Sequence, residues 1–234
     1  AANVHFIELH KTTNDLIIAT HGRGIIIIDD ISPLRQLNEK ALSEELHFFK
    51  MKPTVMSEAN GFGSTSTETQ FIGENSSRAA KITYYLKKRH TLGKMTLEIQ
   101  DETGKKVTEL GPGKSKGINV VEWNYNSKPP KVAKGKTFTY GGFTSPRVAA
   151  GTYKVIIQKG KETFTNDLVI EYDSLSTIPL ADRKLNEQTT LKLFNMTQEL
   201  AYMVHEIDKT LEAAENVKTK NPASAKSVAP IIIE

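Results

Sequence analysis

The side chains best suited to acid–base or metal chemistry are the six histidines, and their spacing favours no metal site. They are His5, His10, His21, His47, His90 and His205. His5 and His10 are five residues apart, so in a strand their side chains would point to opposite faces. The chain has no cysteine, which excludes disulfides, zinc–thiolate sites, iron–sulfur clusters and cysteine nucleophiles. We therefore expect no metal and no cofactor.

One acid–base combination can be tested from the sequence, that of His21 with Asp29 and Asp30. The two acids follow the histidine only after a whole predicted strand. Adjacent strand residues also diverge, whereas glycosidase carboxyls must face one substrate. The chain lacks G-x-S-x-G, H-E-x-x-H, phosphate-loop and dinucleotide motifs. We expect no catalytic residue.

The turn His21-Gly22-Arg23-Gly24 is the first candidate ligand contact. Backbone amides together with the Arg23 guanidinium could hold an anion there. The alternative is a structural turn, in which Gly22 and Gly24 supply the positive φ angles or close backbone approach that a tight strand connection needs. The sequence favours the structural turn.

A second candidate contact lies in the irregular segment 126–147, which is rich in Lys, Pro and Gly. Tyr140 and Phe143 stand there near Arg147 and could form a small ligand-contact patch. The alternative, which we favour, is a surface loop whose aromatic side chains fold back onto the protein.

The elements that must position these residues begin with three β-rich runs, at 4–9, 15–20 and 24–30. Ile25 to Ile28 shows no polar alternation, so both faces of the third strand are expected to be buried. Three short strands cannot cover their own second apolar face. We expect the long C-terminal helix, the segment 31–57 or a second copy to cover it.

The middle of the chain predicts an immunoglobulin-like β-sandwich. Short alternating runs separated by turn signals support this fold class, and they lie at 82–88, 95–100, 105–110, 117–125, 151–158 and 162–172. The single tryptophan, Trp123, is expected in the core because a large inward strand residue contributes burial. The preceding segment 31–80 reads as a connector, with one or two helical turns near 37–46 and a Gly/Ser/Thr-rich loop at 58–78.

The last segment predicts a long amphipathic helix. Neither Pro nor Gly occurs from Asp182 to about Val217, and apolar residues recur there every three or four positions. Asp182 is a candidate N-cap. We therefore expect three N-terminal strands, a sandwich and a long helix, mainly β overall. The expected division is 1–30, a connector at 31–80, the sandwich at 81–173, a helical segment at 174–217 and a linker or tail at 218–234.

Charge is distributed unevenly along the 234 residues. Residues 1–80 carry 7 Lys/Arg and 10 Asp/Glu, residues 81–161 carry 17 and 5, and residues 162–234 carry 7 and 12. The basic middle could attract an anionic polymer or surface. The alternative is that lysines, spread over turns and strands, keep sheet edges soluble. No stacking aromatics interleave with them, so we expect no nucleic acid, and no apolar run reaches the ~20 residues of a membrane span.

Residues 15–37, DLIIATHGRGIIIIDDISPLRQL, carry a family resemblance. A strand, T-H-G-R-G, an apolar strand, D-D and I-S-P-L together resemble the closing end of the β-propeller in the bacterial BNR-repeat "glycosyl hydrolase" family, related to sortilin-type and sialidase-type propellers. The resemblance implies that residues 1–30 are strands of a last propeller blade, with the rest of the propeller outside this chain. No BNR Asp box occurs in the sequence.

A second resemblance covers the sandwich. L-E-I-x-D-x-x-G-K-x-V from Leu97, G-x-N-x-V-x-W from Gly117 and P-R-V-A-A-G-T-Y-K-V from Pro146 are similar to the Ig-like domain of the flagellar hook-capping protein. The same domain follows the propeller in the BNR-repeat family. The sequence departs from this compact domain at 126–147.

Together the resemblances imply a secreted or periplasmic protein and leave two functions open. The first is a non-catalytic accessory, assembly or surface-glycan-binding region of a propeller protein. The second is the C-terminal part of a BNR-type glycoside hydrolase whose active site lies in a propeller outside this chain. The partners to expect are the rest of its own propeller, a second copy bound through the N-terminal strands or the C-terminal helix, and an anionic glycan.

Overall fold

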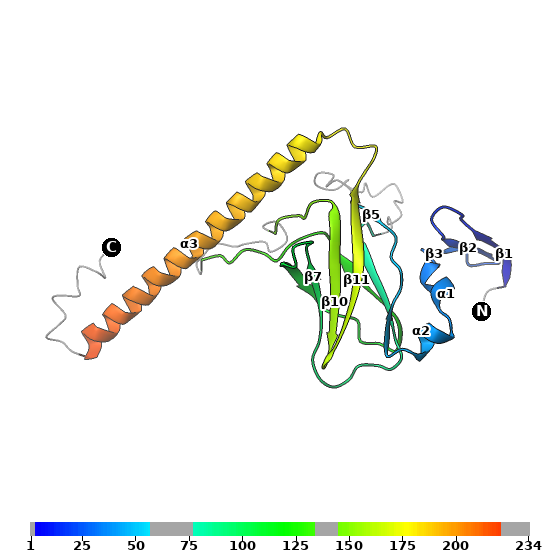
Figure 1. Ribbon diagram of the computed structural model, residues 1–234, viewed down its shortest axis with the longest axis horizontal. Coiled ribbons are helices and arrows are strands. Elements are labelled where there is room, and N and C mark those ends of the chain that lie inside the picture. Colours follow the sequence, from blue (N-terminus) through cyan, green and yellow to red (C-terminus); the bar gives the residue numbers. More distant parts are fainter. Residues whose placement is uncertain (1–2, 57–76, 134–144, 221–234) are drawn as a thin grey trace. The chain divides into compact units, whose positions relative to one another are not determined.

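The structure is a computed structural model, and it describes residues 3–56, 77–133 and 145–220. The described part is mainly β, with three sheets and one long C-terminal helix (Figure 1). In chain order the elements are β1 (Val4–Leu9), β2 (Leu16–Thr20), β3 (Ile25–Ile28), α1 (Ser32–Gln36), α2 (Glu39–Ser43), β4 (Leu46–Phe48), β5 (Thr54–Met56), β6 (Ala80–Leu86), β7 (Met95–Gln100), β8 (Lys106–Leu110), β9 (Gly117–Trp123), β10 (Gly151–Lys159), β11 (Glu162–Tyr172) and α3 (Leu180–Lys220).

The chain divides into two compact units. The first comprises Ala1–Tyr125 with Ala150–Leu175, and the second comprises Asn126–Ala149 with Ser176–Glu234. All three sheets therefore belong to the first unit, and α3 belongs to the second.

The N-terminal sheet has the order β1-β2-β3 and is antiparallel throughout. The three predicted strands are confirmed. The expectation that the segment 31–57 buries Ile25 to Ile28 is wrong for its described residues 31–56: the exposed fractions of the four isoleucines are 69%, 44%, 60% and 43%. The strand forms because β-branched residues suit a pleated backbone, and the described part of the connector leaves it open to solvent.

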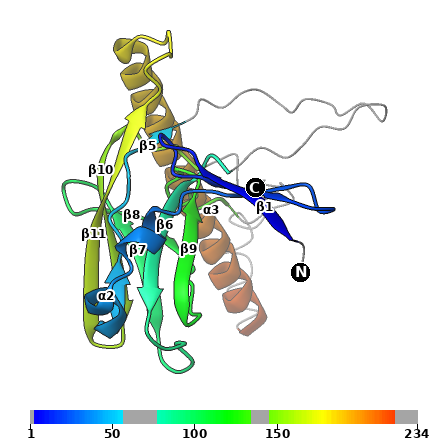
Figure 2. The same cartoon turned by 90° about the vertical axis from the view of Figure 1, so that its right-hand side faces the viewer.

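Two further sheets face each other in a sandwich-like arrangement. One has the order β5-β11-β10-β7-β8, and the other β4-β6-β9; Figure 2 shows the sheet containing β10 and β11 beside the sheet containing β6 and β9. β7 alternates as predicted, with Met95, Leu97 and Ile99 buried. Trp123 is 2% exposed, and its ring centroid lies 5.4 Å from that of Tyr153 on the opposite sheet.

β6 differs from the expected half-buried strand. Ile82, Tyr84 and Leu86 point into the core as predicted, but Thr83 and Tyr85 on the other face are also buried. The connector 31–56 covers this outer face, since Thr83 lines a hollow beneath it and the amide of Phe49 donates to the Thr83 carbonyl (3.3 Å).

The connector is more ordered than the sequence indicates. The helical turns expected near 37–46 appear as α2, which begins after Asn38, whose side chain accepts from the amide of Ala41. α1 precedes it and carries Pro33 in its first turn, a position where the missing amide hydrogen is harmless. β5 then pairs in parallel with the end of β11.

The second unit is built on α3, a 41-residue helix, about 62 Å long at 1.5 Å per residue. The predicted helix is confirmed, but it begins at Leu180, so Asp182 lies in the first turn rather than at the cap. A carboxylate there still interacts favourably with the helix dipole. The Lys131 ammonium lies over the ring of Tyr202, 5.1 Å from its centroid.

Candidate functional site

The most unusual surface of the first unit is the sheet β1-β2-β3, which is apolar on both faces. The register places Ile7, Ile18 and Ile26 side by side on one face, and Phe6, Ala19 and Ile25 on the other. The exposed fractions of Ile7 and Phe6 are 58% and 60%. We call this element the two-faced sheet. Soluble proteins rarely leave a contiguous apolar area open unless a partner covers it.

β3 is also an edge strand. It pairs with β2 along one side, and its other side carries no strand of the described part of the chain. Exposed edges of natural sheets usually carry charges or proline that discourage pairing, whereas β3 is four isoleucines. The edge is therefore available to a partner strand as well as the two faces.

The turn 21–24 connects β2 to β3. Gly22 and Gly24 have φ angles of 83° and 69°, the left-handed region that glycine adopts without strain. The ring of His21 lies 5.4 Å from that of His5, centroid to centroid, a pairing that the sequence spacing did not reveal. The turn thus has the backbone geometry of a strand connection.

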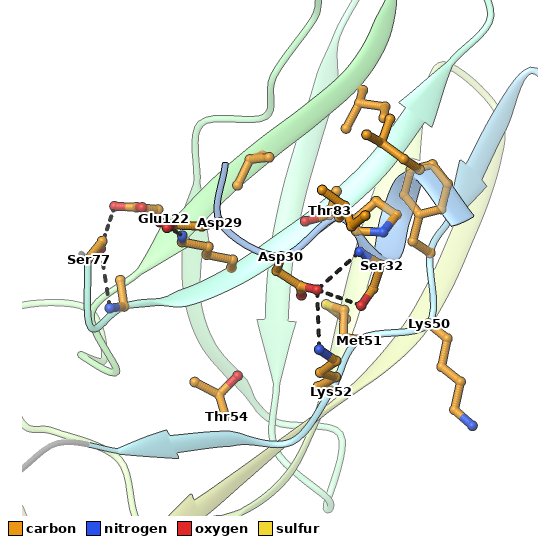
Figure 3. Close-up of a pocket in the computed structure, with 18 of the residues that line it drawn as sticks. Asp29, Asp30, Ser32, Lys50, Met51, Lys52, Thr54, Ser77, Thr83 and Glu122 are labelled. Atoms are coloured by element: carbon orange, nitrogen blue, oxygen red, sulfur yellow. Dashed lines mark hydrogen bonds and ion pairs between the residues drawn. The ribbon is translucent and has the colours of Figure 1, made fainter. Parts of the chain in front are cut away.

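A hollow of about 530 Å³ lies where β3 passes into the connector (Figure 3). At its centre the Asp30 carboxylate accepts from the Ser32 amide (3.1 Å) and hydroxyl and from the Lys52 ammonium (3.2 Å). The Asp30 amide donates to the Asp15 carboxylate (2.9 Å). We call these four residues the Asp30 cluster.

The electrostatics of the cluster favour ionised carboxylates. Partial burial acts to raise the pKa of Asp30, but hydrogen bonds from Ser32 and Lys52 outweigh it and lower the pKa. The pKa of Asp15 is lowered chiefly by the Thr13 hydroxyl and then by the Asp30 amide. Both acids are therefore held as anions, which suits a structural role and not proton transfer near neutrality.

Two further acids that line the hollow also have partners within the protein. Asp29 lies 3.5 Å from the Lys81 ammonium, and the Ser77 hydroxyl donates to Glu122 (2.9 Å). His21 stands at the other end of β3 from Asp29 and Asp30, about 13 Å of strand away at ~3.3 Å per residue. The structure does not bring these three residues together.

The other candidate contacts divide between described and undescribed parts. Tyr140 and Phe143 lie outside the described residues. Arg147 belongs to the second unit, where it forms an isolated antiparallel bridge with Asn126. Among the residues that the structure describes, no three His, Asp or Glu side chains gather as a metal site would require, and no helix there is long and apolar enough to cross a membrane.

Comparison with protein-family models finds no matching family, and comparison with curated proteins and with solved structures finds no match either. The function must therefore be argued from the chain's own surfaces.

Proposed function

We propose that this chain is a non-catalytic assembly region of a secreted or periplasmic β-propeller protein, and that it docks through the two-faced sheet. The observation that carries the proposal is the exposure of apolar side chains on both faces of β1-β2-β3, with Ile25 69% exposed and Ile7 58% exposed on opposite faces. Under this proposal the sandwich is an Ig-like domain that follows the propeller.

The geometry suits a propeller blade better than a sandwich edge. A sandwich sheet needs one apolar face, whereas a blade packs against a neighbouring blade on each side and needs two. A three-stranded sheet with two apolar faces and an open apolar edge matches the second requirement. The T-H-G-R-G turn, which gives the resemblance to the closing blade, joins two strands of this same sheet.

The pairing of the acids in the hollow agrees with a structural role for this part of the chain. Asp29 and Asp30 are both engaged by lysines, and neither faces a histidine. The cluster fixes the passage from β3 into the connector, which would hold the docking sheet in register with the sandwich.

The test is binding between this chain and the propeller region of the protein that carries it, produced separately and followed by calorimetry. Changing Ile26→Lys on one face, or Ile25→Lys with Ile27→Lys on the other, should abolish binding, because a charge buried without a partner is strongly unfavourable. The same changes should lower the chain's own unfolding midpoint far less than they weaken binding, since Ile25, Ile26 and Ile27 are already 69%, 44% and 60% exposed.

The matched control is Leu42→Lys in α2, an apolar residue that is 42% exposed but lies outside the sheet. It should bind like the unmodified chain. Undiminished binding by all the isoleucine variants would overturn the docking surface. Hydrolysis of chromogenic glycosides by the isolated chain would overturn the non-catalytic assignment, and hydrolysis only by the assembled protein would favour a glycoside hydrolase whose site lies in the propeller.

A further inference from the structure

Three loops meet at one end of the sandwich and concentrate its positive charge. They are 87–94, which joins β6 to β7, 111–116, which joins β8 to β9, and 159–161, the last residue of β10 and the turn into β11. Together they carry eight Lys/Arg and no Asp or Glu, while the acids Glu44 and Glu45 lie beside them, where the Lys87 amide donates to the Glu45 carbonyl (3.2 Å). We call this surface the cationic end. The sequence shows these lysines as spread along the chain, and only the strand register brings them together.

The register and backbone hydrogen bonds fix this convergence. Leu86 pairs with Gly117 and Lys159 pairs with Met95, so the three connections leave the same end of the two sheets. The amide of His90 donates to the carbonyl of Lys114 (2.9 Å), and the amide of Gly160 donates to that of Lys94 (3.3 Å). The loops are therefore tied to one another.

Most of these cations have no acidic partner. Lys159 pairs with Glu45 and lies 4.0 Å from Glu162, and the Lys87 ammonium donates to the Ser43 carbonyl (3.1 Å). The others are exposed and, within the described part of the chain, form no ion pair: Lys88, Arg89, Lys94, Lys114, Lys116 and Lys161.

Two segments at the opposite end of the sandwich have the reverse character. The turn 101–105 and the segment 171–175 carry Asp101, Glu102, Glu171 and Asp173 against Lys105 alone. Six cations that have no acidic partner among the described residues, at one end of the sandwich, favour an anionic partner there.

A large apolar side chain stands among these cations. Leu92 lies in the β6–β7 loop, between Arg89 and Lys94, and is 85% exposed. An apolar side chain at a loop tip gains nothing from a hydrated polyanion, but it gains transfer free energy in a hydrocarbon layer. The three loops contain no Phe, Tyr or Trp, so they lack the stacking surfaces that single-stranded nucleic acids use.

We propose that the cationic end binds the surface of a membrane that contains anionic lipids, with Leu92 entering the headgroup region and the surrounding lysines contacting the headgroups. Clustered Lys and Arg side chains near an anionic bilayer each add to the attraction. The arrangement describes a protein that lies on the membrane rather than one that spans it. This inference is independent of the docking of the two-faced sheet.

The test is sedimentation of the full chain with vesicles of phosphatidylglycerol and phosphatidylcholine in equal amounts, compared with vesicles of phosphatidylcholine alone. We expect partitioning only onto the anionic vesicles at 0.1 M salt, and its loss at 1 M salt, where the Debye length falls from about 10 to about 3 Å. The triple change Lys88→Gln, Arg89→Gln and Lys94→Gln should lower the partition coefficient about a hundredfold, roughly fivefold per charge.

Two control variants separate this surface from general charge and apolarity. Lys105→Gln removes an exposed lysine at the opposite end. It should lower the partition coefficient by less than the roughly fivefold expected for each charge of the triple variant. Leu92→Ser should lower it about tenfold, whereas Leu175→Ser, at an equally exposed leucine (87%), should leave it unchanged. Because the chain has no cysteine, a dye on Thr91→Cys reports insertion directly, with Glu102→Cys as the control.

Several outcomes would overturn the proposal. One is equal binding to neutral and anionic vesicles, and another is no binding at 0.1 M salt. A third is an equal loss from Leu92→Ser and Leu175→Ser. Binding to a soluble anionic polysaccharide that Leu92→Ser does not alter, without partitioning onto vesicles, would replace the lipid surface by an anionic polymer.

Discussion

Gly113 leaves room for the Asn119 side chain, which holds the loop 111–116 by hydrogen bonds. An added Cβ there would lie 2.7 Å from the amide oxygen of Asn119. Asn119 is buried, and its side chain accepts from the Ser115 amide and donates to the carbonyls of Ser115 and Gly117. The Tyr84 hydroxyl donates to the Gly113 carbonyl (2.6 Å), and burial raises the pKa of Tyr84 to about 12.

We expect Gly113→Ala to lower the free energy of unfolding by about 1–3 kcal/mol, because the new methyl group displaces the buried Asn119 amide from its hydrogen bonds. Urea unfolding followed by Trp123 fluorescence measures it. Gly111→Ala is the matched control, since a Cβ at Gly111 meets nothing within 4 Å, and it should stay within about 0.5 kcal/mol. Equal effects at both positions would refute the close contact.

Asp30 should make the stability of the fold depend on pH in the acid range. Its pKa in the folded state lies below the usual 3.8, so its anion stabilises the fold above that value, and this contribution disappears as the pH falls through the folded-state pKa. Asp30→Asn should therefore be less stable than the unmodified chain at neutral pH, and the gap should close in acid. Urea midpoints across pH measure the gap, and Glu102→Gln, at an exposed turn carboxylate, should show none.

At the scale of elements, most strands and turns could be predicted from local sequence patterns. β7 alternates strictly, and the β10–β11 hairpin turns at Gly160, whose φ of 62° suits glycine. The pairing of β5 with β11 could not be predicted, because three residues at 54–56 join a partner more than a hundred positions away. The run of isoleucines at 25–28 predicted a strand but not its exposure, because burial depends on what covers a sheet.

The candidate sites were harder to predict for the same reason. The sequence displays the lysines of the cationic end, yet their convergence depends on the pairings Leu86–Gly117 and Lys159–Met95. The Asp30 cluster likewise joins residues from 15 to 52 through a left-handed backbone at Asp30, whose φ is 41°. Neither arrangement leaves a local spacing that a motif could capture.

α3 offers a test of packing on one side of a helix. Ala201 is 8% exposed, although Leu200 and Tyr202 beside it are 59% and 52% exposed. In Ala201→Leu the larger side chain should not fit on the covered side of the helix. The substitution should lower the helix melting temperature and the free energy of unfolding by about 1 kcal/mol or more. Ala213→Leu, at an exposed alanine of the same helix, should be neutral because Leu and Ala have similar helix propensities. Thermal circular dichroism compares the two.

At the scale of the whole molecule, the two compact units carry different spectroscopic signals. The single tryptophan lies in the core of the first unit, and the long helix lies in the second. We expect tryptophan fluorescence and far-UV ellipticity to change at different temperatures, because separate units need not unfold cooperatively. Gly113→Ala should shift only the fluorescence transition, and coincident transitions in both proteins would contradict the prediction.

The two-faced sheet should also affect how much unassembled chain accumulates in a cell. A newly made copy presents four consecutive solvent-exposed isoleucines on an open sheet edge. Chaperones and proteases act on exposed apolar segments of this kind, and aggregation begins from them. Binding to the partner buries the segment, whereas in an unassembled copy the segment stays exposed to chaperones and proteases. The same side chains that we propose for docking would thereby limit the amount of chain that accumulates without its partner.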